Sequence, residues 1–242
     1  MSGHSKWHNI QGRKGKQDAM RSGQFTKLSK LITISAKSGG DPATNFSLRL
    51  AIEKAKAVSM PKDNIERAIK RGTGELVGEQ IEEVLYEGYG AGGIAVLVKC
   101  LTDNKNRAVS EVKHIFSGNG GSMAGAGSVQ WMFQQLGIVV LKKEDLEQKQ
   151  IVQDDFELAM VEEGAEDIKN EEGLVEVRTK IENFQKVLAK IKEIGVEPVE
   201  SGLQWVAKDK VSVNHETEEK LGNLFADLEE NDDVEDYFTN AE

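Results

Sequence analysis

Residues 25–72 read FTKLSKLITISAKSGGDPATNFSLRLAIEKAKAVSMPKDNIERAIKRG, and the spacing of the apolar residues in this stretch predicts three helices. Gly39-Gly40 stops the first helix, and Asn45 suits the N-cap of the second. Pro61 is tolerated in the first turn of the third helix, which Gly72 ends. The predicted helices cover residues 25–36, 45–58 and 61–72.

This helical stretch belongs to a strongly basic end of the chain. The first 72 residues hold 15 of the 31 Lys and Arg residues but only five of the 41 Asp and Glu residues. Their net charge is +10, whereas the remaining 170 residues carry −20, so the whole chain of 242 residues carries −10. A charge separation of this kind indicates a polyanionic partner, most often nucleic acid.

Some cations of the basic end are better candidates for phosphate contacts than others. Lys27, Lys30 and Lys37 lie roughly opposite the apolar stripe of the first helix, which gives that helix a positive face. Cations at the end of the third helix suit the helix dipole without any ligand, and two of them follow an acid by four residues. These two expected ion pairs are Asp63–Arg67 and Glu66–Lys70, and they leave Arg71 as the candidate from that helix.

The first 17 residues have almost no apolar periodicity, so they are either a solvated terminus or an arm that orders on a phosphate backbone. Trp7, between His4 and His8, favours the arm, because an aromatic ring can stack on a nucleobase. The candidate contacts in the arm are Lys6, Trp7, Arg13, Lys14 and Lys16.

A linker over 72–80 leads into two apolar segments, 81–88 and 94–101, which are predicted to be strands. The residues between them match the dinucleotide-binding pattern G-x-G-x-x-G through Gly88, Gly90 and Gly93. A dinucleotide site needs a helix after the glycines, whereas a second strand follows here. The pattern therefore predicts a hairpin turn.

The next segments are predicted to be a helix to about Phe116, a mobile Gly-rich loop over 117–128 and a strand over 129–133. The loop lacks the Gly-Lys-Ser/Thr ending of a phosphate-binding loop. Its glycines would also allow a backbone to approach RNA or DNA closely.

From residue 137 the pattern predicts strand, helix, strand, strand, helix, strand, which is the order of a ferredoxin-like unit. A further amphipathic helix over 216–228 and a strand over 234–238 follow. The acidic side chains between and around them are read as solvated, or as a mask for the basic end when no partner is bound.

The composition weighs against several classes of protein. No stretch is apolar enough for a spanning helix, the N-terminus lacks the apolar region of a secretory signal, and Cys100 has no cysteine partner, which fits a cytoplasmic protein. Cys100 lies in an apolar segment and is expected to be a buried structural thiol. The histidines have no metal-ligand spacing and no catalytic constellation stands out, so we expect no enzyme, cofactor or metal site.

Several motifs resemble those of the YebC/PmpR family. They begin with GHSKW at 3–7, RKGK at 13–16 and FTK at 25–27. They continue with MPKDNIERAI at 60–69, YEGYG at 86–90 and LTDNKNR at 101–107, and they extend to GSV at 127–129. After about residue 133 the chain agrees with the family in length and element order rather than in motif.

The resemblance implies an α+β protein with a helical N-terminal domain and two α+β domains, the third ferredoxin-like and inserted in the second. The expected domains are 1–78, 79–136 with 209–242, and 137–208. Family members are described chiefly as cytoplasmic transcriptional regulators that bind DNA. Relatives resemble a mitochondrial translational activator, and some members are implicated in helping ribosomes through proline-rich stretches.

The leading hypothesis is therefore a non-enzymatic transcriptional regulator whose basic end binds DNA, with no membrane partner. The alternative is a ribosome-associated factor that binds rRNA, which fits the charges equally well. A protein-binding scaffold and an enzyme acting in a cleft between domains remain further hypotheses. The sequence leaves the oligomeric state open.

Overall fold

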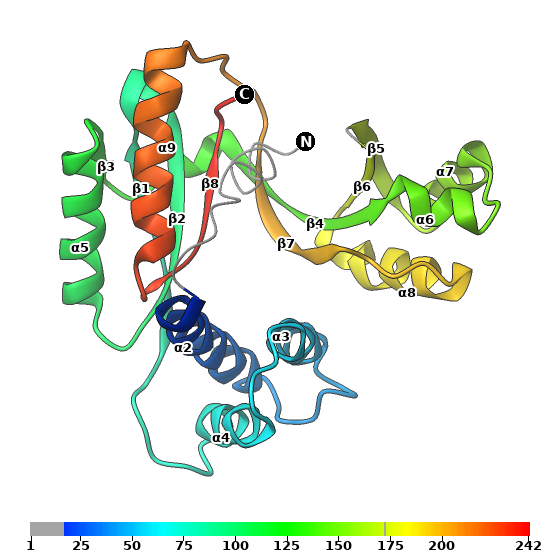
Figure 1. Ribbon diagram of the computed structural model, residues 1–242, viewed down its shortest axis with the longest axis horizontal. Helices are drawn as coiled ribbons and strands as arrows, with labels where there is room; N and C mark the ends of the chain where they lie inside the picture. Colours follow the sequence, from blue (N-terminus) through cyan, green and yellow to red (C-terminus); the bar gives the residue numbers. More distant parts are fainter. Residues whose placement is uncertain (1–16, 172) are drawn as a thin grey trace. The chain divides into compact units, whose positions relative to one another are not determined.

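The computed structural model describes residues 17–171 and 173–242, and these divide into two compact units. The large unit comprises residues 17–132 and 209–242, and the small unit comprises residues 133–208 (Figure 1). The α+β class that the sequence predicts is confirmed. Within the described residues, no helix has the length and apolar character needed to cross a membrane.

The large unit begins with three helices, α2 (Gln17–Ala36), α3 (Phe46–Ala57) and α4 (Lys62–Gly72), called here the helical segment. Asn45 caps α3 as predicted, since its side-chain oxygen accepts a hydrogen bond from the backbone N–H of Leu48. The segment has its own apolar core, formed by Ile32, Ala36, Leu48, Ala51, Ile52, Ala55, Met60, Ile65 and Ala68.

Helices α2 and α4 approach each other closely. A Cβ atom on Gly72 would collide with the backbone oxygen of Thr33, so only glycine fits at this crossing. The buried Thr33 hydroxyl donates a hydrogen bond to the backbone oxygen of Ala68 across the same contact, at 3.2 Å. The mutual position of α2 and α4 is therefore set by backbone contact.

An antiparallel sheet follows the helical segment in the large unit, with strand order β3-β1-β2-β8. Helices α5 (Lys105–Gly118) and α9 (His215–Glu230) lie side by side on one face of it (Figure 1). Their apolar side chains share a core with β2 and β8. The strands are β1 (Glu82–Tyr89), β2 (Ala95–Thr102), β3 (Ser122–Ala124) and β8 (Val234–Thr239).

The glycines between β1 and β2 form a hairpin connection, as predicted, rather than a dinucleotide site. Tyr89 pairs with Ala95 across the turn, and the intervening residues form the short 3₁₀ helix η1 (Ala91–Gly93). Gly92 and Gly93 both have positive φ, which glycine adopts without strain.

The predicted strand over 129–133 is wrong. Residues 130–132 form the 3₁₀ helix η2 (Gln130–Met132), and the next strand begins only at Phe133. The Glu87 carboxylate accepts hydrogen bonds from the backbone N–H groups of Val129 and Gln130, which are therefore unavailable to a sheet. The Gly-rich segment is also more ordered than predicted, because β3 lies within it and pairs with β1.

The small unit has an antiparallel sheet with strand order β5-β6-β4-β7. In chain order the strands are β4, β5, β6 and β7, so the first strand lies between the third and the fourth, and the second lies at the edge beside the third. This is the strand order of a ferredoxin-like fold. Its elements are β4 (Phe133–Lys142), α6 (Lys143–Gln148), α7 (Gln153–Glu162), β5 (Ala165–Glu171), β6 (Leu174–Thr179), η3 (Ile181–Asn183), α8 (Phe184–Ile194) and β7 (Glu200–Ala207).

Candidate nucleic-acid interface

The sequence predicts nine contact residues, and the structure describes four of them. Lys27 and Lys30 lie on α2, Lys37 directly follows α2, and Arg71 lies in the last turn of α4. The five residues of the predicted arm fall outside the described part of the chain; they are Lys6, Trp7, Arg13, Lys14 and Lys16.

The three predicted lysines all bind oxygens of their own chain. Lys27 Nζ donates to the backbone oxygen of Glu229 at 2.6 Å, and Lys37 Nζ donates to the backbone oxygen of Ile81 at 2.6 Å. Burial lowers the pKa of Lys27, and nearby carboxylates offset only part of this effect. Lys27 and Lys30 are half-buried, whereas Lys37 is exposed. These contacts give the lysines a structural role in the large unit, and their contact with phosphate stays a prediction.

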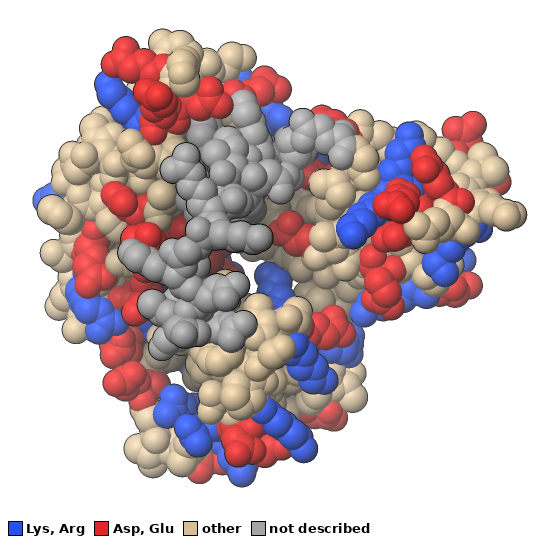
Figure 2. All heavy atoms as spheres, in the orientation of Figure 1, with Lys and Arg blue, Asp and Glu red and all other residues tan. Residues whose placement is uncertain are grey.

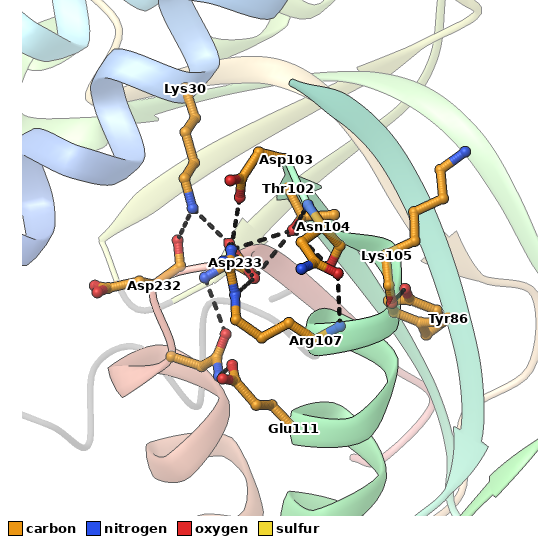
Figure 3. Close-up of polar contacts among 11 residues, drawn as sticks. Lys30, Tyr86, Thr102, Asp103, Asn104, Lys105, Arg107, Glu111, Asp232 and Asp233 are labelled. Atoms are coloured by element: carbon orange, nitrogen blue, oxygen red, sulfur yellow. Dashed lines mark hydrogen bonds and ion pairs between the residues drawn. The ribbon is translucent and has the colours of Figure 1, made fainter. Parts of the chain in front are cut away.

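Lys30 belongs to a buried polar cluster around Asp233, whose side chains converge in Figure 3. Lys30 Nζ lies 2.6 Å from Asp233 Oδ1, and Arg107 Nε lies 3.0 Å from Asp233 Oδ2. The Thr102 hydroxyl donates a third hydrogen bond to Asp233 Oδ2 at 3.0 Å. The Asp233 cluster, formed by Lys30, Thr102, Arg107 and Asp233, thus joins α2 to β2, α5 and the residue before β8.

The charges in the Asp233 cluster stabilise one another. Burial alone would raise the pKa of Asp233, which is 2% exposed, but Lys30 and Arg107 outweigh burial and lower it. Asp103 and Asp233 together raise the pKa of Arg107. Asp233 was not singled out from the sequence, where it is one of a run of acids read as solvated.

A groove lies between α2, α4 and the linker that leads to β1, with a volume of about 570 Å³. We call it the α2–α4 groove. Thr26, Ser29, Lys30 and Thr33 line it from α2, and Asn64, Arg67, Ala68 and Arg71 line it from α4. Phe25, Gly78, Glu79 and Ile81 complete the lining.

The two arginines of the groove have no acidic partner among the described residues. The expected Asp63–Arg67 and Glu66–Lys70 pairs do not form within that part of the chain. Glu66 Oε1 instead lies 3.4 Å from Lys62 Nζ. The reason for discounting Arg67 therefore does not hold in the folded chain. Arg71 extends along the linker, since a Cβ on Gly78 would lie 3.4 Å from its Cδ.

A second buried carboxylate, that of Glu87, orders the end of the Gly-rich segment. Its oxygens accept hydrogen bonds from the backbone N–H groups of Gly127, Val129 and Gln130 at 2.5, 2.7 and 2.9 Å. Burial raises the pKa of Glu87, but these N–H groups outweigh it and lower the pKa. Trp131, which follows directly, is 64% exposed.

Two further observations concern thiol reactivity and metal binding. Cys100 is buried as predicted, and this burial raises its pKa to about 12, so it is a protonated structural thiol. Among the described residues, no three His, Cys, Asp or Glu side chains come close enough together to bind a metal ion.

Two family models match most of the chain. The model for the TACO1/YebC protein N-terminal domain matches residues 5–75, and the model for the TACO1/YebC second and third domain matches residues 81–241. The match boundary at 75–81 falls in the linker between α4 and β1.

Individual proteins are similar over nearly their whole length. A probable transcriptional regulatory protein of Caldanaerobacter subterraneus is 47% identical, with 100% of this chain and 98% of that protein covered. One of Maridesulfovibrio salexigens is 50% identical, with 100% and 96% covered. The crystal structure of a conserved hypothetical protein from Aquifex aeolicus superposes with a TM-score of 0.85 at 38% identity, covering 98% of this chain and 96% of that one.

Proposed function

Because this chain belongs to the TACO1/YebC family, we propose that it is a cytoplasmic transcriptional regulator that binds DNA through its basic N-terminal part and catalyses no reaction. The names of its relatives support the regulatory role. The charge separation along the chain supports a polyanionic partner.

The observation that carries the proposal is a group of exposed cations on α3 and α4 that form no ion pair with any described residue. Such cations remain available to phosphates, and each phosphate neutralised on duplex DNA adds about 0.9 to the salt slope of binding. Figure 2 shows Lys and Arg side chains, interspersed with Asp and Glu, over the region of these helices. The group consists of Lys54, Lys56, Arg67, Lys70 and Arg71.

The three lysines on and after α2 are less suitable positions for testing this proposal. Lys27 and Lys30 already bind the chain near α9 and β8, so replacing them would disturb packing as well as charge. Lys37 is exposed and has donors left after its bond to Ile81. Substitutions on α3 and α4 therefore test phosphate binding without also disturbing packing.

The test is fluorescence anisotropy of a labelled duplex DNA at several KCl concentrations. Replacing Lys54, Lys56 and Lys70 with Gln removes three charges without touching a buried contact. We expect weaker binding and a salt slope smaller by up to about 2.7, or 0.9 per lost phosphate contact. Glu144→Gln, an exposed acid of the small unit, is the control and should leave the slope unchanged. An unchanged slope in the triple variant would contradict the proposal.

The alternative function is that of a ribosome-associated factor that binds rRNA and relieves stalling at proline-rich stretches. The same exposed cations serve an RNA backbone equally well, and the concave α2–α4 groove favours a strand whose bases are unpaired. Cosedimentation with ribosomes, measured beside binding to promoter fragments, separates the two functions.

A further inference from the structure

We propose that the α2–α4 groove binds one nucleotide unit of a single-stranded nucleic acid, with its phosphate held by Arg67 and Arg71. The inference rests on the proposed binding of nucleic acid by the basic end, which the leading and the alternative function share, and it specifies the ligand. It distinguishes two contributions to the affinity of the basic end. The exposed cations bind any phosphate backbone, and within the α2–α4 groove Arg67 and Arg71 bind an unpaired strand more tightly than a duplex.

The positive charge of the groove comes from one side of α4. Arg67 and Arg71 are one helical turn apart, so both side chains leave the same face of the helix, and both line the groove. Neither has an acidic partner within the described residues, and a guanidinium group binds phosphate through two parallel hydrogen bonds. Lys30 adds positive charge from α2, although its Nζ is already held by Asp233. Glu79, on the linker, is the one acid of the lining.

The remaining lining suits a sugar and a base. The Asn64 amide and the Ser29 hydroxyl make no hydrogen bond to any described residue, so their donors and acceptors are available to a ligand. Phe25, Ala68 and Ile81 add apolar surface. An apolar wall with a few free polar groups is the usual composition of a small-molecule site.

The buried part of the groove lining selects against a duplex. Its volume of about 570 Å³ lies within the range of ligand pockets, about 300–1,000 Å³. Three residues of its lining are buried, since Thr33, Ala68 and Ile81 are 4%, 2% and 6% exposed. A duplex presents phosphates on a convex surface and keeps its bases stacked inside. We expect only a nucleotide turned out of an unpaired strand to reach these buried residues.

The experiment compares full-length protein binding to three labelled 12-mers of one sequence: single-stranded RNA, single-stranded DNA and duplex DNA. We expect the wild type to prefer a single strand by roughly tenfold, the scale of one stacked base. A preference for RNA over single-stranded DNA would identify the 2′-hydroxyl as part of the ligand.

Two matched double variants separate the groove from the exposed lysines. Arg67→Gln with Arg71→Gln should remove the preference for the single strand. Lys54→Gln with Lys56→Gln loses the same charge on α3, outside the groove lining, and should weaken single-strand and duplex binding by the same factor. Melting temperatures close to that of the wild type show that both variants fold.

A third variant tests the base contact. Asn64→Ala should weaken single-strand binding and leave its salt slope unchanged, because an amide neutralises no phosphate. Equal losses on single strand and duplex in both double variants would overturn the groove while leaving the proposed function intact. Absence of binding to all three oligonucleotides would overturn both.

Discussion

Asp233 is the residue at which three elements of the large unit meet. Its carboxylate accepts hydrogen bonds from Lys30 on α2, Thr102 at the end of β2 and Arg107 on α5. Three of the residues around it belong to the motif LTDNKNR, since Thr102 and Arg107 bind Asp233 and Asp103 binds Arg107 at 2.7 Å. This motif therefore has a structural role in the large unit.

Replacing Asp233 with Asn should destabilise the large unit by about 2–3 kcal/mol, because the amide turns a donor toward Lys30 or Arg107. Hydrogen exchange of α2 and α5 amides, followed by mass spectrometry, measures the effect. Asp232→Asn is the control, since it removes the same charge from an exposed neighbouring position. Equal effects of the two substitutions would show that the cluster adds no specific stability.

The lowered pKa of Asp233 also sets the direction of a pH dependence. A carboxylate whose pKa is lower in the folded state contributes stability that is complete above its ordinary pKa of 3.8. That stability is lost as the pH falls through the folded value. The difference in stability between the wild type and Asp233→Asn should therefore shrink in strongly acidic solution.

At the scale of elements, close backbone approach decides how helices lie on their neighbours. Gly137 in β4 faces the ring of Phe184 at the start of α8, and a Cβ there would lie 2.6 Å from Phe184 Cδ2. Since real Cβ contacts are longer, Gly137→Ala must displace α8 or its aromatic ring.

Gly137→Ala should destabilise the small unit by about 1–3 kcal/mol, the usual cost of overpacking a core. Gly202→Ala is a matched control on the neighbouring strand β7, because a Cβ at Gly202 has no atom within 4 Å. The control should be neutral or slightly stabilising. Hydrogen exchange of β4 and β6 amides measures both, and protection retained in Gly137→Ala would contradict the packing argument.

At the scale of the whole molecule, the chain enters and leaves the small unit through paired strands. Phe133, the first residue of β4, pairs with Ala207, the last residue of β7. Paired residues of an antiparallel sheet lie about 5 Å apart. The small unit is thus connected as an insertion, since its two ends meet and the large unit continues on either side.

This connection predicts that the small unit folds by itself. Its buried apolar residues, among them Val139, Phe156, Val177 and Leu188, all lie within 133–208. A short Gly-Ser linker should also join Met132 to Asp209 and leave nucleic-acid binding by the large unit intact. The measurements are the dispersion of amide signals in an NMR spectrum of residues 133–208 alone and nucleic-acid binding by the shortened chain. An NMR spectrum without such dispersion would show that the small unit needs the rest of the chain to fold.

Local sequence patterns were sufficient for most of the fold. Apolar periodicity, the Asn45 cap and glycine positions located the three helices of the helical segment, although α2 begins at Gln17, eight residues before its predicted start. Element order predicted the ferredoxin-like unit. These features depend on residues close together in the chain. The strand predicted over 129–133 is wrong because its N–H groups bind Glu87, more than 40 residues earlier.

For the candidate interface, the sequence by itself determined that positive charge is concentrated at the N-terminal end. Only the tertiary structure decided which cations remain available. Lys27 and Lys30 meet oxygens some 200 residues away, whereas Arg67 and Arg71 lie in a groove without acidic partners in the described chain. Charge is a sum over residues and can be read from composition, but the pairing of a charge depends on which distant atoms folding brings within hydrogen-bond distance.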